Sequence, residues 1–247
     1  MRARSRALAV VALALPALAH AAHPFVTEDP GTQGTGHFEL ELGFGAFNGD
    51  PSIPGRTNAF APQFSIGVLD NVDLIAQAVR VSQTPADGAT LVGQGSMLLD
   101  VKWRFKETDD YALGVRAGLD LPVGDASDNL ASGQLGAHAI GILSVTVGEY
   151  AVYANAGYAF TRQPNTRRNV GAFSIALTRP DDKPLRGFVE AATYANPDPS
   201  RSLWPAFARA GAIWSVNEWL DVDAGVQARL NSAAARVGLL AGMTLRW

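Results

Sequence analysis

The sequence predicts an all-β fold, an antiparallel up-and-down transmembrane β-barrel of about 12 strands. Three observations support this prediction: an export signal at the start of the chain, about twelve segments in which apolar and polar residues alternate, and a final alternating strand that stops on an aromatic residue. Alternation with a period of two also suits a strand in a soluble sandwich. Its repetition after an export signal favours the barrel.

Residues 1–22 have the features of a signal peptide. Three arginines precede an apolar run over 7–19, and residues 19–21 fit an A-x-A cleavage site, which places cleavage after Ala21 or Ala22. The apolar run is short of the roughly 20 residues that a membrane-spanning helix needs, and no later stretch reaches that length. A mature protein in a membrane must therefore be a closed barrel, because an open sheet would leave unpaired backbone groups in lipid.

Composition excludes several classes of function. Removing the signal peptide takes Lys+Arg from 20 to 17 against 23 acids, so the net charge falls from −3 to −6, which argues against a nucleic-acid partner. The absence of cysteine excludes a disulfide framework, thiolate catalysis and cysteine-ligated metal. The chain has no phosphate loop, zinc spacing or dinucleotide fingerprint, so we expect no cofactor and no metal.

Twelve segments carry the alternation, and several are close to the roughly 9–11 residues of a tilted membrane strand. They are 36–47, 57–68, 72–82, 93–106, 111–123, 134–147, 151–161, 169–178, 186–194, 204–216, 220–230 and 236–247. Tight connections face longer ones that are rich in Gly, Pro, Asn, Asp and Ser. Short periplasmic turns and longer extracellular loops are typical of outer-membrane barrels, and an even count places both termini in the periplasm. Some segments alternate poorly, so 10 or 14 strands remain compatible.

The alternation also assigns the two faces of a strand. In 93–106, Leu99, Val101 and Trp103 alternate with Asp100 and Lys102. A sandwich would bury the apolar face in a core, whereas a barrel would turn it to lipid and the charges to the lumen. Aromatic residues lie towards strand ends, where a girdle at the lipid–water boundary would place them. They are Trp103, Phe105, Tyr111, Tyr158, Phe160, Trp204, Trp214 and Trp247. The closing strand with its terminal Trp247 resembles the assembly signal of bacterial outer-membrane barrels.

Four stretches carry a family resemblance: HPFVTEDPGTQGTGHFELELGF at 23–44, LDLPVGD at 119–125, NAGY at 155–158 and the closing strand. They resemble the outer-membrane β-barrel family of transporters named for the meta-pathway of phenol degradation. The resemblance covers the mature chain, and its motifs are structural. It implies a channel in the bacterial outer membrane that passes small organic compounds, with aromatic and hydrophobic compounds as the candidates, without implying ligand-contacting residues.

Polar residues on the inward face are the candidate site. The candidates are Glu41, Asp100, Arg116, Asp120, His138, Glu190, Arg209, Asp223, Gln227 and Arg229. Folding two strands about a turn near Thr108 places Asp100 opposite Arg116 as an ion pair. Such pairs either neutralise a filled interior or form a constriction that selects permeants. Twelve strands enclose a narrower space than a 16-stranded porin.

Two alternatives come from single residues. His138 would be the base of a lipid-hydrolase site if a serine lay within reach, but Ser144 and Asn155 are out of register, so a lumen-lining role is favoured. The loop 124–129 offers Asp125 and Asp128 for Ca²⁺ without the spaced acidic set of a dedicated site, which favours a solvated turn.

The predicted organisation is therefore a signal peptide at 1–22 and a single barrel domain at 23–247, with a short periplasmic segment at 23–35. The expected partners are outer-membrane lipid, the barrel-assembly machinery and a small-molecule permeant. An outer-membrane enzyme, a filled structural barrel and a soluble exported binding protein are the alternatives, and the oligomeric state is left open.

Overall fold

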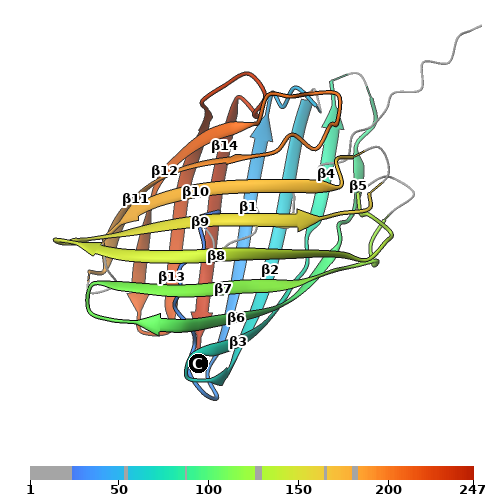
Figure 1. The fold of residues 1–247 in the computed structure, drawn as a ribbon. Coiled ribbons are helices and arrows are strands. Elements are labelled where there is room, and N and C mark those ends of the chain that lie inside the picture. The colour runs from blue at the N-terminus through green and yellow to red at the C-terminus, as the bar shows by residue number, and fades with distance from the viewer. Residues whose placement is uncertain (1–23, 53–54, 87, 126–129, 164–165, 180–182) are drawn as a thin grey trace, which may run out of the picture.

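The strands form one closed antiparallel ring (Figure 1). The structure, a computed structural model, describes residues 24–52, 55–86, 88–125, 130–163, 166–179 and 183–247. The strands are β1 (Phe38–Asn48), β2 (Gly55–Leu69), β3 (Val72–Gln77), β4 (Arg80–Pro85), β5 (Leu91–Gln94), β6 (Met97–Glu107), β7 (Tyr111–Leu121), β8 (Gly136–Val147), β9 (Tyr150–Phe160), β10 (Asn169–Thr178), β11 (Leu185–Tyr194), β12 (Ala206–Asn217), β13 (Leu220–Arg229) and β14 (Val237–Arg246).

Two transmembrane spans are each divided into two strands, so the 14 strands make a barrel of 12 spans. β3 and β4 both pair with β2 and are separated by Ala78 and Val79, while β5 and β6 are separated by Gly95 and Ser96. β3 then pairs with β6, and β4 pairs with β5. The predicted count of about 12 is confirmed.

The first and last strands close the ring. β1 pairs with β14 over a continuous register from Glu39 opposite Arg246 to Asn48 opposite Val237, and its other edge pairs with β2. The backbone of Phe38 exchanges two hydrogen bonds with that of Trp247, at 2.8 and 3.1 Å. The C-terminus lies at the end of the barrel that carries the tight turns (Figure 1). No open edge therefore remains between the first and last strands.

The two faces of the wall are inverted relative to a soluble protein. Outside, large apolar side chains are exposed, among them Trp103, Ile175 and Leu239, whereas Glu41, Asp73 and Arg116 are buried inside. A soluble sandwich would bury the apolar face instead, so the inversion identifies a lipid-facing barrel. In the described part of the chain, no helix is long and apolar enough to cross a membrane.

Candidate functional site

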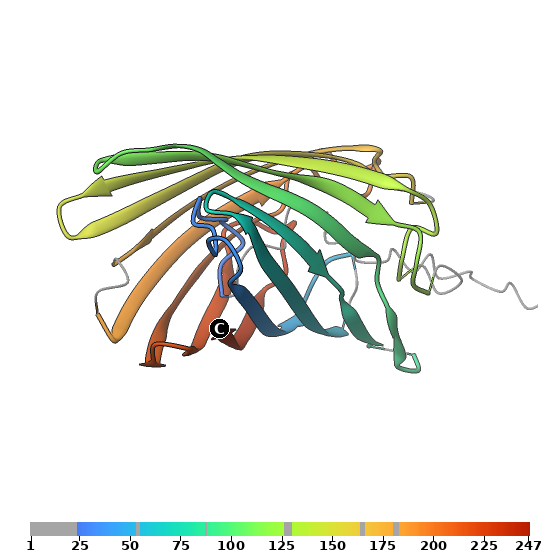
Figure 2. The same cartoon turned by 90° about the horizontal axis from the view of Figure 1, so that it is seen from below.

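The segment that precedes β1 lies inside the barrel. Figure 2, seen from below, shows this blue segment within the ring of strands. The sequence predicts a periplasmic position for 23–35, and that prediction is wrong for residues 24–33, which bond to side chains on the inner face of β3, β6, β7, β9, β11 and β12. We call residues 24–33 the plug.

The tip of the plug is held by two neighbouring wall residues. Glu190 and Arg209 lie opposite each other on β11 and β12. Glu190 Oε1 accepts hydrogen bonds from the backbone N–H of Val26 at 2.9 Å and of Thr27 at 2.6 Å, and from the Thr27 hydroxyl at 2.6 Å. Arg209 Nη1 donates to the Pro24 carbonyl at 3.1 Å. These backbone groups have no partner in a β-strand, and the side chains of the wall supply their hydrogen-bond partners.

Glu28 fixes the centre of the plug. Its carboxylate bonds to Lys102 Nζ and to Arg116 Nη1, both at 2.8 Å, and all three side chains are buried. Burial alone would raise the pKa of Glu28, but the cations Lys102 and Arg116 outweigh it and hold that pKa below its ordinary value. Asn155 adds a reciprocal pair, since its amide accepts from Glu28 N–H at 2.6 Å and donates to Glu28 C=O at 2.9 Å.

The base of the plug is tied to the wall where the chain turns into β1. The Gln33 N–H donates to the Asp73 carboxylate at 3.1 and 3.2 Å. The next turn contains Gly34 and Gly36, both at φ +81°, a conformation that favours glycine. Gly36 N–H then donates to the carbonyl of Gly67 on β2 at 2.8 Å.

The predicted ion pair between Asp100 and Arg116 is present with a shifted register. Glu107 pairs with Ala112, so the turn is centred between Asp109 and Asp110 and not near Thr108. With a one-residue shift at the bulge between Arg104 and Lys106, Lys102 and not Asp100 lies directly opposite Arg116. The Arg116 side chain reaches diagonally to Asp100 Oδ2 at 2.7 Å and donates to Gln63 at 3.0 Å. Because Arg116 also binds Glu28, this ion pair of the wall is linked directly to the plug.

His138 lies between two carboxylates. Its Nε2 is 3.0 Å from Asp100 Oδ1, and its Nδ1 is 2.8 Å from Asp120 Oδ1. Ser144, the serine considered for a hydrolase site, lies opposite Tyr153 in the β8–β9 pairing, while His138 lies opposite Ala159. The two ring nitrogens therefore face acids, and the arrangement extends the charged network of Arg116.

The structure places the sequence candidates as follows. Glu41, Asp100, Arg116, Asp120, His138, Glu190, Asp223 and Gln227 are buried on the inner face. Arg209 is partly buried beside the plug, and Arg229 is exposed at the end of β13. In the loop 124–129, Asp128 lies outside the described residues, and the Asp125 carboxylate accepts a hydrogen bond from the Gln94 N–H. The described residues contain no group of three metal-ligating side chains.

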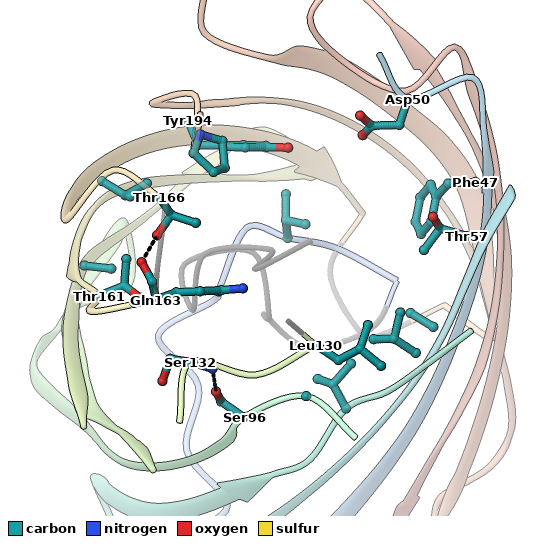
Figure 3. A pocket seen from close by; sticks show the side chains of 18 of the residues that line it. Phe47, Asp50, Thr57, Ser96, Leu130, Ser132, Thr161, Gln163, Thr166 and Tyr194 are labelled. Atoms are coloured by element: carbon teal, nitrogen blue, oxygen red, sulfur yellow. Dashed lines mark hydrogen bonds between the residues drawn. The ribbon is translucent and has the colours of Figure 1, made fainter. Parts of the chain in front are cut away.

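An apolar cavity of about 110 Å³ lies between the plug and the longer loops (Figure 3). Val79, Val81, Leu98 and Val170 line its wall, and Val26 of the plug contributes to its floor. The loops supply Asp50, Leu130, Ala131, Ser132, Gln163, Thr166, Arg167, Pro197, Ala234 and Ala235. Polar side chains also line it, Tyr194, Arg209 and Gln227 among them. An apolar cavity with a few placed polar groups is typical of a small-molecule site.

A second cavity, of about 230 Å³, lies on the other side of the plug and is strongly charged. Its acidic lining residues are Glu28, Asp29, Glu39, Glu41, Asp73, Asp221 and Asp223, against the cations Lys102, Arg186 and Arg246. Ion pairs cross this space, including Arg186 to Asp221 at 3.1 Å and Arg246 to Glu39 at 2.8 Å. The plug thus separates an apolar compartment from a charged, acidic one.

The sequence candidates include three wall residues that hold the plug, Arg116, Glu190 and Arg209. They omit Glu28, Lys102, Asn155 and Tyr194. Asp100, Lys102 and Arg116 together carry two positive charges and one negative charge. This excess positive charge could have indicated a missing acid, because buried charges are paired.

Comparison with known proteins agrees with this architecture. The family model described as “Putative MetA-pathway of phenol degradation” matches residues 21–247. The fold is similar to the COG4313 outer membrane channel from Pseudomonas putida F1, with a TM-score of 0.72 and 10% identity over 89% of this chain and 98% of that one. It is also similar to the NanC porin (0.61, 9% identity, 83% and 98%) and the KdgM porin (0.57, 7% identity, 84% and 98%). A comparison with curated proteins found no match. The fold is that of a bacterial outer-membrane β-barrel.

Proposed function

The chain belongs to the family of the MetA-pathway of phenol degradation, and on that basis we propose that it is an outer-membrane channel that passes small, apolar organic compounds. The observation that carries this proposal is the apolar cavity above the plug. It lies inside a closed barrel and is bordered by the longer loops, where a compound that enters from outside the cell would be held first. The solved structures with this fold include an outer membrane channel and two porins, which supports a transport role.

The plug determines what can pass. Its contacts with Glu190, Arg209, Lys102 and Arg116 close the lumen between the two cavities, so passage requires the plug to move. The apolar lining favours compounds that gain from leaving water, at roughly 25 cal/mol for each Å² of apolar surface buried. Sugars and other hydrophilic solutes gain nothing comparable in this cavity.

The test is uptake by intact cells. A Gram-negative host would produce the protein in its outer membrane, and the initial rate of uptake of radiolabelled toluene would be compared with that of glucose. We expect the protein to raise toluene uptake and leave glucose uptake unchanged.

A matched pair of variants ties the result to the cavity. Ala59→Trp fills the cavity and should lower toluene uptake to the background rate, whereas Asn58→Trp, on the outward face of the same strand, should leave it unchanged. If correctly assembled wild-type protein gave no increase in toluene uptake, the channel proposal would fail in favour of a filled structural barrel.

A further inference from the structure

We propose that Arg209 and Tyr194 form a selectivity site in the apolar cavity, which favours uncharged monocyclic compounds that carry a hydroxyl or carbonyl oxygen over hydrocarbons of the same shape. This inference rests on the proposed function and names the chemical class that the cavity admits. Its evidence is the hydrogen-bonding capacity of the two side chains and the balance of charge around them.

Arg209 keeps a hydrogen-bond donor available to the cavity. Its side chain is only 10% exposed, and a guanidinium carries five N–H donors. Nε donates to Gln227 Oε1 at 3.0 Å and Nη1 to the Pro24 carbonyl at 3.1 Å, but Nη2 makes no hydrogen bond to any described residue. The guanidinium also lies 5.2 Å from the centre of the Phe207 ring, which fixes its plane. Nη2 can therefore donate to a ligand oxygen in the cavity.

Tyr194 supplies a second polar group in the lining of the same cavity. Its ring packs against the cluster formed by Val26, Phe207 and Ala234, so the position of the ring is set by the plug and the wall. In Figure 3 the hydroxyl points across the cavity, towards the side of Asp50. Within the described residues this hydroxyl has no hydrogen-bond partner. A phenolic hydroxyl can donate or accept, so it suits either a carbonyl or a hydroxyl on the ligand.

The charges around the cavity balance, which favours a neutral ligand. Among the described residues, two acids, Asp50 and Asp120, and two cations, Arg167 and Arg209, line it. Glu190 Oε2 also lies 3.9 Å from Arg209 Nη1, so a ligand carboxylate on Arg209 would approach a buried carboxylate. Burying a net charge without a partner is costly, whereas a neutral oxygen needs only the available donors.

The volume limits the ligand to about one ring. The cavity measures about 110 Å³ and its wall is aliphatic. For scale, an engineered apolar cavity of about 150 Å³ in another protein stays dry and binds benzene. A six-membered ring with one substituent is therefore the size that fits.

The experiment compares three probes of one shape: cyclohexanone, methylcyclohexane and cyclohexanecarboxylate. Dissociation constants would be measured by ligand-observed NMR on the full mature chain in lipid nanodiscs. The Ala59→Trp protein supplies the background from partition into the bilayer. We expect wild type to bind cyclohexanone roughly tenfold more tightly than methylcyclohexane, as one hydrogen bond to a charged donor allows. Cyclohexanecarboxylate should bind more weakly than cyclohexanone.

Variants assign the preference to the two residues. Tyr194→Phe removes one hydroxyl and keeps the ring, and it should weaken cyclohexanone binding roughly three- to tenfold without changing methylcyclohexane binding. Tyr153→Phe, in the acidic cavity, is the matched control and should change neither. Arg209→Lys should also reduce the preference, and Tyr194→Phe alone carries the test if that variant does not assemble.

The outcomes separate this inference from the proposed function. Equal binding of cyclohexanone and methylcyclohexane by wild type, or an unchanged preference in Tyr194→Phe, would overturn the selectivity site even if toluene uptake is normal. Tighter binding of the carboxylate than of the ketone would overturn it as well. The expected preference in a protein that shows no uptake would support the site and defeat only the channel.

Discussion

Glu28 and Arg116 lie 88 positions apart in the chain, yet they form a buried ion pair of 2.8 Å inside the barrel. Arg116 also bonds to Asp100, which contacts His138, so one continuous set of charges extends from the plug into three strands of the wall. The occlusion of the lumen is therefore electrostatic at its centre, and changes to a single carboxylate should affect it.

The first prediction concerns that carboxylate. Glu28→Gln leaves Lys102 and Arg116 buried without their shared acid, and breaking a buried pair in this way costs about 3–5 kcal/mol. We expect a lower free energy of unfolding in urea and a higher single-channel conductance, because the plug loses its central attachment. Glu149→Gln, which removes an acid from the exposed pair with Arg179, is the control and should change neither measurement.

A second prediction concerns pH. The pKa of Glu28 is lowered in the folded protein, so its stabilising contribution is complete above the ordinary value of 4.5 and is lost as pH falls through the lower folded value. The cations Lys102 and Arg116 stay charged over this range. The stability difference between wild type and Glu28→Gln, measured by thermal unfolding, should therefore shrink below pH 4.5. A difference that stays constant from pH 7 to pH 3 would contradict this assignment.

The third prediction tests the lipid-facing surface by depth. Ile175 lies near the middle of β10 and Leu185 at the turn end of β11, and both are more than half exposed. Arginine on the lipid face costs about 2–4 kcal/mol at the midplane and about 0–1 kcal/mol near the boundary. Ile175→Arg should therefore lower the free energy of unfolding in lipid far more than Leu185→Arg. Equal effects would place both residues at the same depth.

The fourth prediction concerns the end of the chain. Trp247 stacks on Phe38 with ring centres 5.9 Å apart, and the two backbones exchange hydrogen bonds at the seam. Trp247→Asp should therefore reduce the heat-modifiable, folded form in outer-membrane fractions and leave unassembled protein in the periplasm. Trp219→Asp, at another exposed aromatic near the same end, should assemble normally. Normal assembly of both variants would show that the terminal aromatic is not an assembly signal.

The wall of the barrel could be predicted from the sequence because each strand records its facing locally. Apolar and charged residues alternate along a strand, as in Leu99, Asp100, Val101 and Lys102. A single strand is therefore enough to assign which side chains face the lumen and which face lipid. The register could not be assigned in this way, because it depends on the centre of the turn, which lies between Asp109 and Asp110 and not near Thr108, and Asp100 therefore pairs with Gly118.

The plug could not be predicted in the same way. Residues 24–33 have no periodicity, and their position depends on Glu190, Asn155 and Arg116, which come from distant strands. Only the closed ring brings those side chains together around one segment. For the same reason the pair of cavity-lining residues Tyr194 and Arg209 had no local signature.

The corner at Gly34 and Gly36 determines how the plug could leave its place. Backbone hydrogen bonds join this corner to Gly67, and the strand that follows it, β1, is paired along both edges. If the plug lost its contacts with Glu190 and Lys102, it would stay attached to the wall at this corner. It would then move towards the end of the barrel that carries the tight turns. Displacement of the plug would leave every wall strand paired. The plug could therefore return to its position without any part of the barrel refolding.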